Sequence, residues 1–348
     1  MATETVETVD QVAHRIATEL ELPAQQRSQD GLLRWCRKRL DRWVGERGSE
    51  IRTLDELGRL VGDKLGLAID EVRHDDDFHR IEREHGGGRD LAVAMVRAEL
   101  DDQTDGLLLK RQRREEWERP FLAVVDGRGG KERRVYFSRW HETAHLLTAN
   151  RQLQFGFQFR RTPVERKDPE EILMDKIAGE LAFYAPLVEP VLADLTRDRG
   201  RLDFDAVENM RLLLAPRASL HASLIGSVNN TSLPAILVRA KYGYKVAEER
   251  IVRDAERRGR QAPSGLVQKL RAVDVTQNDA ARDAGVRVHR NMEVPATSVV
   301  ARALLASPVA GSENLGTWRT SEGPLAARRV YVDARCIDDS VFALITVL

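Results

Sequence analysis

The residues best suited to chemistry are His141, Glu142 and His145, which form an H-E-x-x-H pattern. If this segment is helical, the four-residue spacing places both histidines on one face, where two imidazoles can bind one metal ion. Glu142 can then act as the base that takes a proton from a metal-bound water as the water attacks a carbonyl. The pattern predicts hydrolysis of a peptide bond by a zinc enzyme. Patterns this short also occur by chance, so the neighbouring segments must support it.

A catalytic zinc site usually has three protein ligands and one open position. Downstream, residues 170–186 have the apolar spacing of a helix and end at a proline. Asp175 shares a face of this helix with Ala178 and Ala182, and these small residues would allow close approach to the H-E-x-x-H helix. Glu171 lies one turn before Asp175 on the same side. Asp175 is the candidate third ligand.

Two β-rich runs lie just upstream of the motif. Residues 120–126 and 133–138 are separated by Gly127, Gly129 and Gly130. This arrangement predicts a hairpin that leads directly into the metal-binding helix. Zinc peptidases commonly use such an edge strand to hold an extended substrate by main-chain pairing.

The motif and the run 175–182, which reads D-K-I-A-G-E-L-A, together resemble the ImmA/IrrE family of metallopeptidases. The second helix of that family usually reads Glu-x-x-Ala-Asn-x-Phe-Ala. This chain has Asp in place of Glu and Gly in place of Asn, and the shorter Asp side chain requires the two helices to lie closer together. The resemblance implies zinc ligands His141, His145 and Asp175, with Glu142 as the general base.

The resemblance covers roughly residues 52–240, with 53–67 as the family's first helix. It implies an α+β fold with a zincin-like metallopeptidase domain of helices and a small β-sheet, a helical module, and a C-terminal mixed α/β domain that is GAF-like. Many members cleave a partner helix-turn-helix repressor and so derepress an operon, often after DNA damage. The longer type includes peptidases paired with repressors of bacterial anti-phage (CBASS-type) operons. Such a repressor is therefore the substrate that the resemblance implies.

The chain length and the changes of pattern predict several domains. The expected segments are an N-terminal helical extension (1–50), the metallopeptidase domain (51–200), a helical module with a linker (201–272) and the GAF-like domain (273–348). Within them, residues 11–20 and 31–44 are expected to be helical, and 73–90 is expected to be an irregular insertion.

The region after Pro186 is expected to begin with helices at 188–197 and 203–214. Residues 218–226 and 234–241 then predict a short helical module that looks like a helix-turn-helix. Sequence-specific DNA binding is not favoured, because a recognition helix needs exposed basic residues. The module offers only Arg239, Lys241 and Lys245.

The pattern changes again after a charge-rich helical linker at 246–272. Apolar or alternating runs then predict a small α/β domain that ends in an antiparallel hairpin, with Asp338-Asp339 as its turn. These runs are 286–290, 298–305, 315–320, 328–333 and 340–348.

The composition excludes some classes of protein. Lys+Arg and Asp+Glu both number 55, so the chain as a whole is not strongly attracted to nucleic acid. Charged residues make up 32% and the mean hydropathy is −0.42, and no run is apolar enough to cross a bilayer. The first ten residues are acidic and polar, unlike an export signal. With two cysteines and no disulfide framework, we expect a soluble protein in the reducing cytoplasm.

A basic segment near the N-terminus is the candidate nucleic-acid contact. Its arginines and tryptophans could hold a phosphate backbone and stack on bases, which makes single-stranded DNA a candidate activator. An amphipathic helix with core tryptophans and solvated arginines is the favoured alternative. The candidate contacts are Arg34, Trp35, Arg37, Lys38 and Arg39.

Cysteine could regulate the predicted site, because a thiolate can take the open zinc position. Cys336 lies near the C-terminal hairpin, and Cys36 lies among basic groups that would favour its thiolate. The alternative is that each is an ordinary, partly buried thiol.

Functions other than regulated proteolysis remain open. A regulator could retain the peptidase fold and act only by binding DNA or a ligand, although such a scaffold need not keep Glu142. A constitutive protease is less favoured because it leaves the domain after residue 240 without a purpose.

Overall fold

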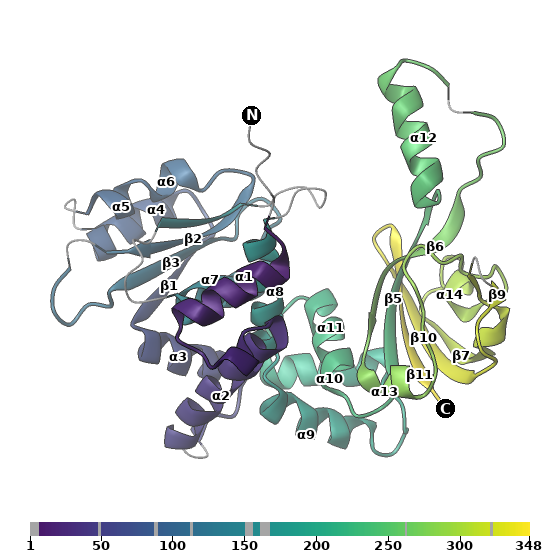
Figure 1. Ribbon diagram of the computed structural model, residues 1–348, viewed down its shortest axis with the longest axis horizontal. Helices are drawn as coiled ribbons and strands as arrows, with labels where there is room; N and C mark the ends of the chain where they lie inside the picture. The colour runs from purple at the N-terminus through teal and green to yellow at the C-terminus, as the bar shows by residue number, and fades with distance from the viewer. Residues whose placement is uncertain are drawn as a thin grey trace. The chain divides into compact units, whose positions relative to one another are not determined.

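The structure, a computed structural model, describes residues 7–47, 50–86, 90–111, 114–149, 156–160, 168–261, 263–320 and 323–348. It is a mixed α+β protein (Figure 1). The chain divides into two compact units, one made of Met1–Leu187 and Arg211–Ala222 and the other of Val188–Met210 and Ser223–Leu348. Among the described residues, no helix has the length and apolar character needed to span a membrane.

Three helices open the first unit, and local signals in the sequence account for their boundaries. Thr8 caps the first helix in a capping box with Gln11, and Thr53 caps the third in the same way with Glu56. The third helix ends at Gly66, which adopts the left-handed conformation with φ 66°. The helices predicted at 11–20 and 31–44 are confirmed. The three are α1 (Val9–Glu19), α2 (Gln29–Arg47) and α3 (Leu54–Leu65).

The first unit contains a four-stranded sheet in the order β1-β3-β2-β4. β1 and β3 are parallel, and the other pairs are antiparallel. β4 is last in the order and is therefore an edge strand. Alternate residues of β2 face opposite sides: Leu107 packs in a cluster with Phe78 and Ile81, whereas Leu108 packs in a cluster with Leu146. The strands are β1 (Leu67–Val72), β2 (Thr104–Lys110), β3 (Phe121–Asp126) and β4 (Gly156–Arg160).

Two expectations for this unit are wrong. Residues 133–138 do not form a hairpin strand, because helix α7 (Val135–Thr148) begins there and β3 pairs with β1 and β2. Val135 and Tyr136 suit a strand, yet both are buried on the helix, so packing overrides propensity. Within the predicted irregular insertion 73–90, residues 73–86 are also more regular than expected, and residues 87–89 lie outside the described residues. The insertion contains α4 (Asp76–Ile81) and a π-helical turn (Glu82–Gly86), and α5 (Leu91–Ala94) and α6 (Val96–Glu99) follow.

The predicted second helix is confirmed as α8 (Pro169–Ala182), which packs against α7. Ala144 of α7 and Ala178 of α8 are both fully buried, which allows close packing. The hydroxyl of Tyr136 donates a hydrogen bond to the carbonyl of Ala182 at 2.6 Å and ties the two helices together. The helices expected at 188–197 and 203–214 are also present. The next helices are α9 (Ala185–Thr196), α10 (Phe204–Leu214) and α11 (Leu220–Asn230).

The second unit contains a five-stranded antiparallel sheet in the order β6-β5-β11-β10-β7. The predicted terminal hairpin is confirmed, with Asp338-Asp339 as its turn. The unit also contains further α-helices and a two-stranded ribbon. These are α12 (Val246–Arg257), α13 (Asp279–Asp283), α14 (Val299–Arg302) and the ribbon of β8 (Arg319–Thr320) with β9 (Gly323–Pro324). The strands are β5 (Ala235–Gly243), β6 (Lys269–Gln277), β7 (Val309–Asn314), β10 (Arg329–Ile337) and β11 (Ser340–Val347).

The predicted helix at 234–241 is wrong, because these residues form most of β5, a central strand of the sheet. A short apolar run fits a buried strand as well as a helix, and its periodicity does not distinguish them. The helix-turn-helix interpretation therefore loses its second helix. Residues 286–290 form no strand, and the run 298–305 contains α14. Along the chain, the sheet of the second unit begins with β5. The boundary expected at residue 273, the start of the GAF-like domain, therefore falls within β6.

Candidate metal centre

Helix α7 brings two imidazoles together on the sheet. His141 and His145 are 0% and 4% exposed, and their Nε2 atoms lie 3.1 Å apart. One helical turn separates them, as their spacing in the sequence predicts. The helix packs on β2 and β3, so the buried sheet fixes the position of both rings.

A third donor comes from the first turn of α8. Glu171 Oε2 lies 3.1 Å from Nε2 of His141, and Oε1 lies 3.4 Å from Nε2 of His145. With zinc–ligand bonds of about 2.0–2.1 Å, neighbouring donors of a tetrahedral site are about 3.3 Å apart. The three side chains match this spacing and form a group that could hold one metal ion. Two neutral imidazoles with one carboxylate are a common donor set of catalytic zinc.

Glu171, rather than the predicted Asp175, joins His141 and His145 in the group that could hold a metal ion. Asp175 Oδ1 lies 3.0 Å from Nδ1 of His141, the ring nitrogen opposite the one beside Glu171. Both carboxylates share a face of α8. The position of α8 along α7 brings Glu171, rather than Asp175, beside the two Nε2 atoms. Asp175 instead accepts a hydrogen bond from His141, which fixes the ring and leaves Nε2 available as a ligand.

The charges of the site favour a cation. Burial opposes protonation of His141, but the hydrogen bonds to Asp175 and Glu171 outweigh it and raise the pKa of His141 to about 9. Burial also opposes the charge on Glu171, yet hydrogen bonds from His141 and His145 lower its pKa to about 2. A proton on the imidazole therefore balances the carboxylates, and a divalent cation between the same side chains would balance them in its place.

Glu142 is the predicted base, and its environment is unusual. Its side chain is 0% exposed, and neither carboxylate oxygen has a hydrogen-bond partner among the described residues. Burial raises its pKa to about 7, against the opposing effect of His141 and His145. A buried carboxylate without a donor is unfavourable unless a bound polar group complements it. This observation and the donor spacing both indicate that the residues fit a hydrated metal ion.

Gly106 of β2 is a functional candidate that sequence reasoning missed. It lies on the same face of the strand as Leu108, the face that packs with Leu146 of α7. A Cβ at position 106 would lie 2.8 Å from Oε1 of Glu142. Only a glycine therefore lets the strand approach this carboxylate so closely. A glycine inside an apolar strand can indicate that another group approaches the backbone closely. The position of Gly106 just before Leu107, Leu108 and Leu109 was therefore the signal in the sequence.

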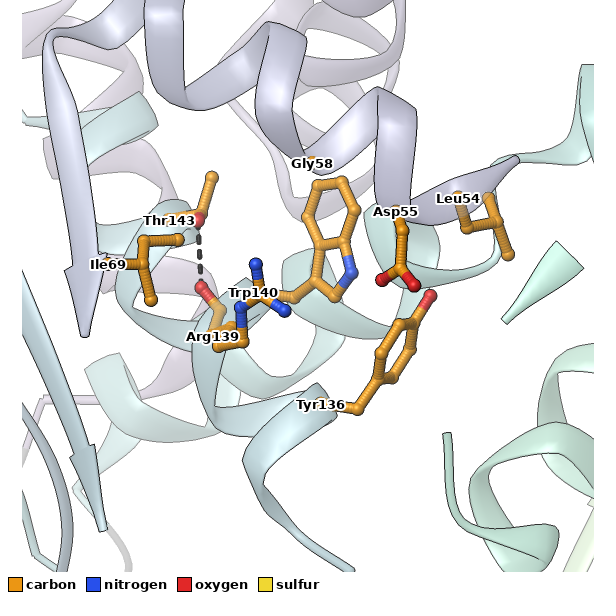
Figure 2. Close-up of a pocket in the computed structure, with 8 residues that line it drawn as sticks. All are labelled: Leu54, Asp55, Gly58, Ile69, Tyr136, Arg139, Trp140 and Thr143. Atoms are coloured by element: carbon orange, nitrogen blue, oxygen red, sulfur yellow. Dashed lines mark hydrogen bonds between the residues drawn. The ribbon is translucent and has the colours of Figure 1, made fainter. Parts of the chain in front are cut away.

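Figure 2 shows a small cavity on a different face of α7. Tyr136, Arg139 and Trp140 of α7 line it together with Asp55 of α3. Its volume of about 10 Å³ suits a single water molecule rather than a substrate. Burial and the neighbouring Arg217 lower the pKa of Arg139. None of the three candidate metal ligands lines this cavity.

Arg39 of the expected nucleic-acid contact is engaged within the protein. Its guanidinium lies 5.2 Å from the ring centroid of Trp35 and 4.9 Å from that of Trp43. It also donates a hydrogen bond to the carbonyl of Leu147, near the end of α7, at 3.2 Å. Arg39 therefore links α2, on which it packs against both rings, to the end of α7.

Arg37 likewise pairs with Glu180 of α8. Arg34 and Lys38 are exposed. Of the five residues predicted to contact nucleic acid, Arg39 and Trp35 therefore interact with each other within the protein, whereas Arg34, Arg37 and Lys38 are exposed, Arg37 in an ion pair with Glu180.

The two cysteines, the candidate regulators of the site, have different environments. Cys36 is 1% exposed, and burial raises the pKa of its thiol to about 12 despite Arg39. The expectation that basic neighbours favour its thiolate is wrong, because desolvation dominates. Cys336 is partly buried in the second unit, where its Sγ lies 3.7 Å from the carbonyl oxygen of Asp338.

Comparison with models of known protein families finds no match, and comparison with curated proteins also finds none. The geometry of the site and the resemblance carried by its motifs are therefore the features that indicate a function for this chain.

Proposed function

We propose that this chain is a zinc-dependent endopeptidase that binds its metal through His141, His145 and Glu171 and uses Glu142 as general base. The main support is the spacing of the donor groups: the two Nε2 atoms lie 3.1 Å apart, and the two oxygens of Glu171 lie 3.1 Å from His141 Nε2 and 3.4 Å from His145 Nε2. Beside them is a buried carboxylate, Glu142, that has no hydrogen-bond partner in the described structure. This combination matches a site for one cation and a proton acceptor next to it.

The residues of the chain have separate tasks in this proposal. Zinc, when bound, acts as a Lewis acid that polarises a peptide carbonyl and makes water more acidic. Glu142, whose pKa is about 7, accepts a proton and returns it to the leaving amine. Asp175 orients His141, and the bare backbone of Gly106 leaves room for the carboxylate of Glu142.

The proposal also includes a fold type for each of the two units. The first unit is assigned a zincin-like metallopeptidase domain, because its active-site helix lies on a small sheet with an edge strand, β4. The second unit, with its five-stranded antiparallel sheet, is assigned a GAF-like sensory domain. Both assignments follow the resemblance to the ImmA/IrrE family in the H-E-x-x-H motif and residues 175–182.

The substrate proposed on the same resemblance is a helix-turn-helix repressor of a stress or anti-phage operon. Single-stranded DNA is the proposed activator. Its support among the predicted contacts of α2 is the exposed cations Arg34 and Lys38, together with Arg37, which is exposed but paired with Glu180. Cleavage should then increase when oligonucleotide is added at low salt and should lose that increase at high salt, because phosphate contacts weaken as salt rises.

The decisive assay compares cleavage of candidate repressors by the wild-type protein and by Glu142→Gln. The variant should keep its zinc and lose cleavage, because the amide cannot accept the proton. Glu180→Gln is the matched control on α8, since Glu180 pairs with Arg37 and lies outside the metal group. Cleavage that persists in Glu142→Gln would remove the proposed mechanism.

A further inference from the structure

The second unit has a pocket with a basic lining that the proposed peptidase chemistry does not use. Its volume is about 480 Å³, which is in the range of small-molecule sites. Residues from β6, from the loop before α14 and from β8 surround it. The lining includes Lys245, Arg271, Arg290, Met292, Glu293 and Arg319.

Arg271 is the residue that indicates a ligand. It is 3% exposed, yet no carboxylate in the described part of the chain forms an ion pair with it. Its Nη1 donates to the carbonyl of Asn291 at 3.2 Å, and none of the residues that the structure describes accepts a hydrogen bond from its Nε. A buried guanidinium without a counter-ion is costly to the fold. Because Arg271 lines the pocket, a bound anion would supply the missing charge.

The neighbouring side chains increase the positive charge. The backbone of Glu293 forms isolated β-bridges with Arg271 and Arg319. Its carboxylate does not neutralise these arginines, because both oxygens accept hydrogen bonds from Lys269, at 2.9 and 2.8 Å. Lys245 and Arg319 are exposed, and neither forms an ion pair within the described residues. The pocket therefore presents three uncompensated cations.

We propose that this pocket binds a small phosphorylated molecule, with its phosphate on Arg271 between Lys245 and Arg319. A guanidinium matches phosphate through paired N–H groups. A phosphate monoester carries close to two negative charges at neutral pH, so it suits three cations better than a single carboxylate does. The volume leaves room for an attached group, such as a nucleoside. The proposal does not depend on the metal site.

The test is thermal unfolding of the full chain with inorganic phosphate, AMP or adenosine at constant ionic strength. Phosphate or AMP should raise the melting temperature in a concentration-dependent way, and adenosine should not. A larger effect of AMP identifies a nucleotide-like ligand, and an equal effect identifies free phosphate. Adenosine acting as well as AMP, or no shift with either phosphate compound, would overturn the proposal.

Variants separate binding from folding. Arg271→Met should weaken the ligand about 10- to 100-fold. It should melt no lower than the wild type without ligand, because it removes a buried unpaired charge. The double change Lys245→Gln and Arg319→Gln alters only exposed side chains and should also weaken the ligand. Arg282→Gln, an exposed change on α13 outside the pocket, is the control and should leave the shift intact. An undiminished shift in the double variant would contradict the proposal.

Discussion

The backbone of Gly106 lies so close to Glu142 that a Cβ at position 106 would be 2.8 Å from Oε1 of the carboxylate. Gly106→Ala should therefore displace the general base while leaving the three metal ligands in place. A displacement of about 1 Å can reduce catalysis by about 10²-fold.

The measurement for this change is kcat together with zinc content. Gly179→Ala is the matched control, because a Cβ at this position on α8 meets no atom within 4 Å. It should keep full activity and gain up to about 1 kcal/mol of stability. Full activity in Gly106→Ala would show that Glu142 does not need this close contact.

Glu171 and Asp175 should differ in their contribution to metal binding. Asp175→Asn removes only the partner of His141 Nδ1 and should weaken zinc about 10- to 100-fold. Glu171→Gln removes a ligand and should weaken zinc further. Competition titration with a chromogenic chelator measures both constants. If Asp175→Asn has the larger effect, Asp175 is the ligand, as the sequence first predicted.

Zinc affinity should rise with pH. The pKa of His141 is about 9 in the metal-free site, and metal binding must remove this proton. Affinity should increase by about tenfold per pH unit for each proton released, up to about pH 9, and then level off. Titrations at several pH values test this. A flat profile between pH 6.5 and 9 would show that His141 does not hold the proton.

The stability of the metal-free protein should depend on pH in the opposite sense. The raised pKa of His141, about 9 against an ordinary 6.5, stabilises the fold below pH 6.5, and this contribution is lost as pH rises through 9. Glu142, with a pKa of about 7 against 4.5, adds a loss between pH 4.5 and 7. Glu171, with a pKa of about 2, costs stability only as pH falls below 4.5.

Urea unfolding in EDTA measures this profile. The free energy of unfolding should fall by up to about 3 kcal/mol from the His141 contribution between pH 6.5 and 9. Glu142→Gln should remove the change between pH 4.5 and 7 and leave the alkaline part. Stability that rises with pH across the whole range would contradict these assignments.

Arg39 should matter for folding rather than for nucleic acid. Arg39→Ala removes the contacts with Trp35 and Trp43 and the hydrogen bond to Leu147. The loss should be about 1–2 kcal/mol by urea unfolding. Lys38→Ala changes an exposed neighbour on the same helix and should have little effect. Equal stabilities of the two variants would argue against the structural role of Arg39.

The sequence predicted the parts of this molecule that are fixed by local rules. The helices expected at 11–20 and 31–44 are present, and the spacing of His141 and His145 is sufficient to place both imidazoles on one side of a helix. The same rules could not choose between Glu171 and Asp175. These residues are one turn apart on one face, and the choice depends on how far α8 is displaced along α7.

Long-range packing also explains the other errors. The run 234–241 is apolar enough for a helix or a strand, and its place between β6 and β11 decides the outcome. Residues 133–138 suit a strand, but they form the end of the turn before α7 and the first turn of that helix, where Val135 and Tyr136 are buried. The close approach of Gly106 to Glu142 depends on two segments distant in the sequence, so no local pattern could identify the pair.

The most direct test of the metal centre is a crystal structure of the zinc-loaded protein with anomalous data recorded on both sides of the zinc edge. We expect one strong anomalous peak about 2.0–2.2 Å from His141 Nε2, His145 Nε2 and a carboxylate oxygen of Glu171. Asp175 should remain on Nδ1 of His141. Absence of a peak between these three side chains, in crystals that contain stoichiometric zinc elsewhere or no zinc at all, would contradict the proposed metal centre.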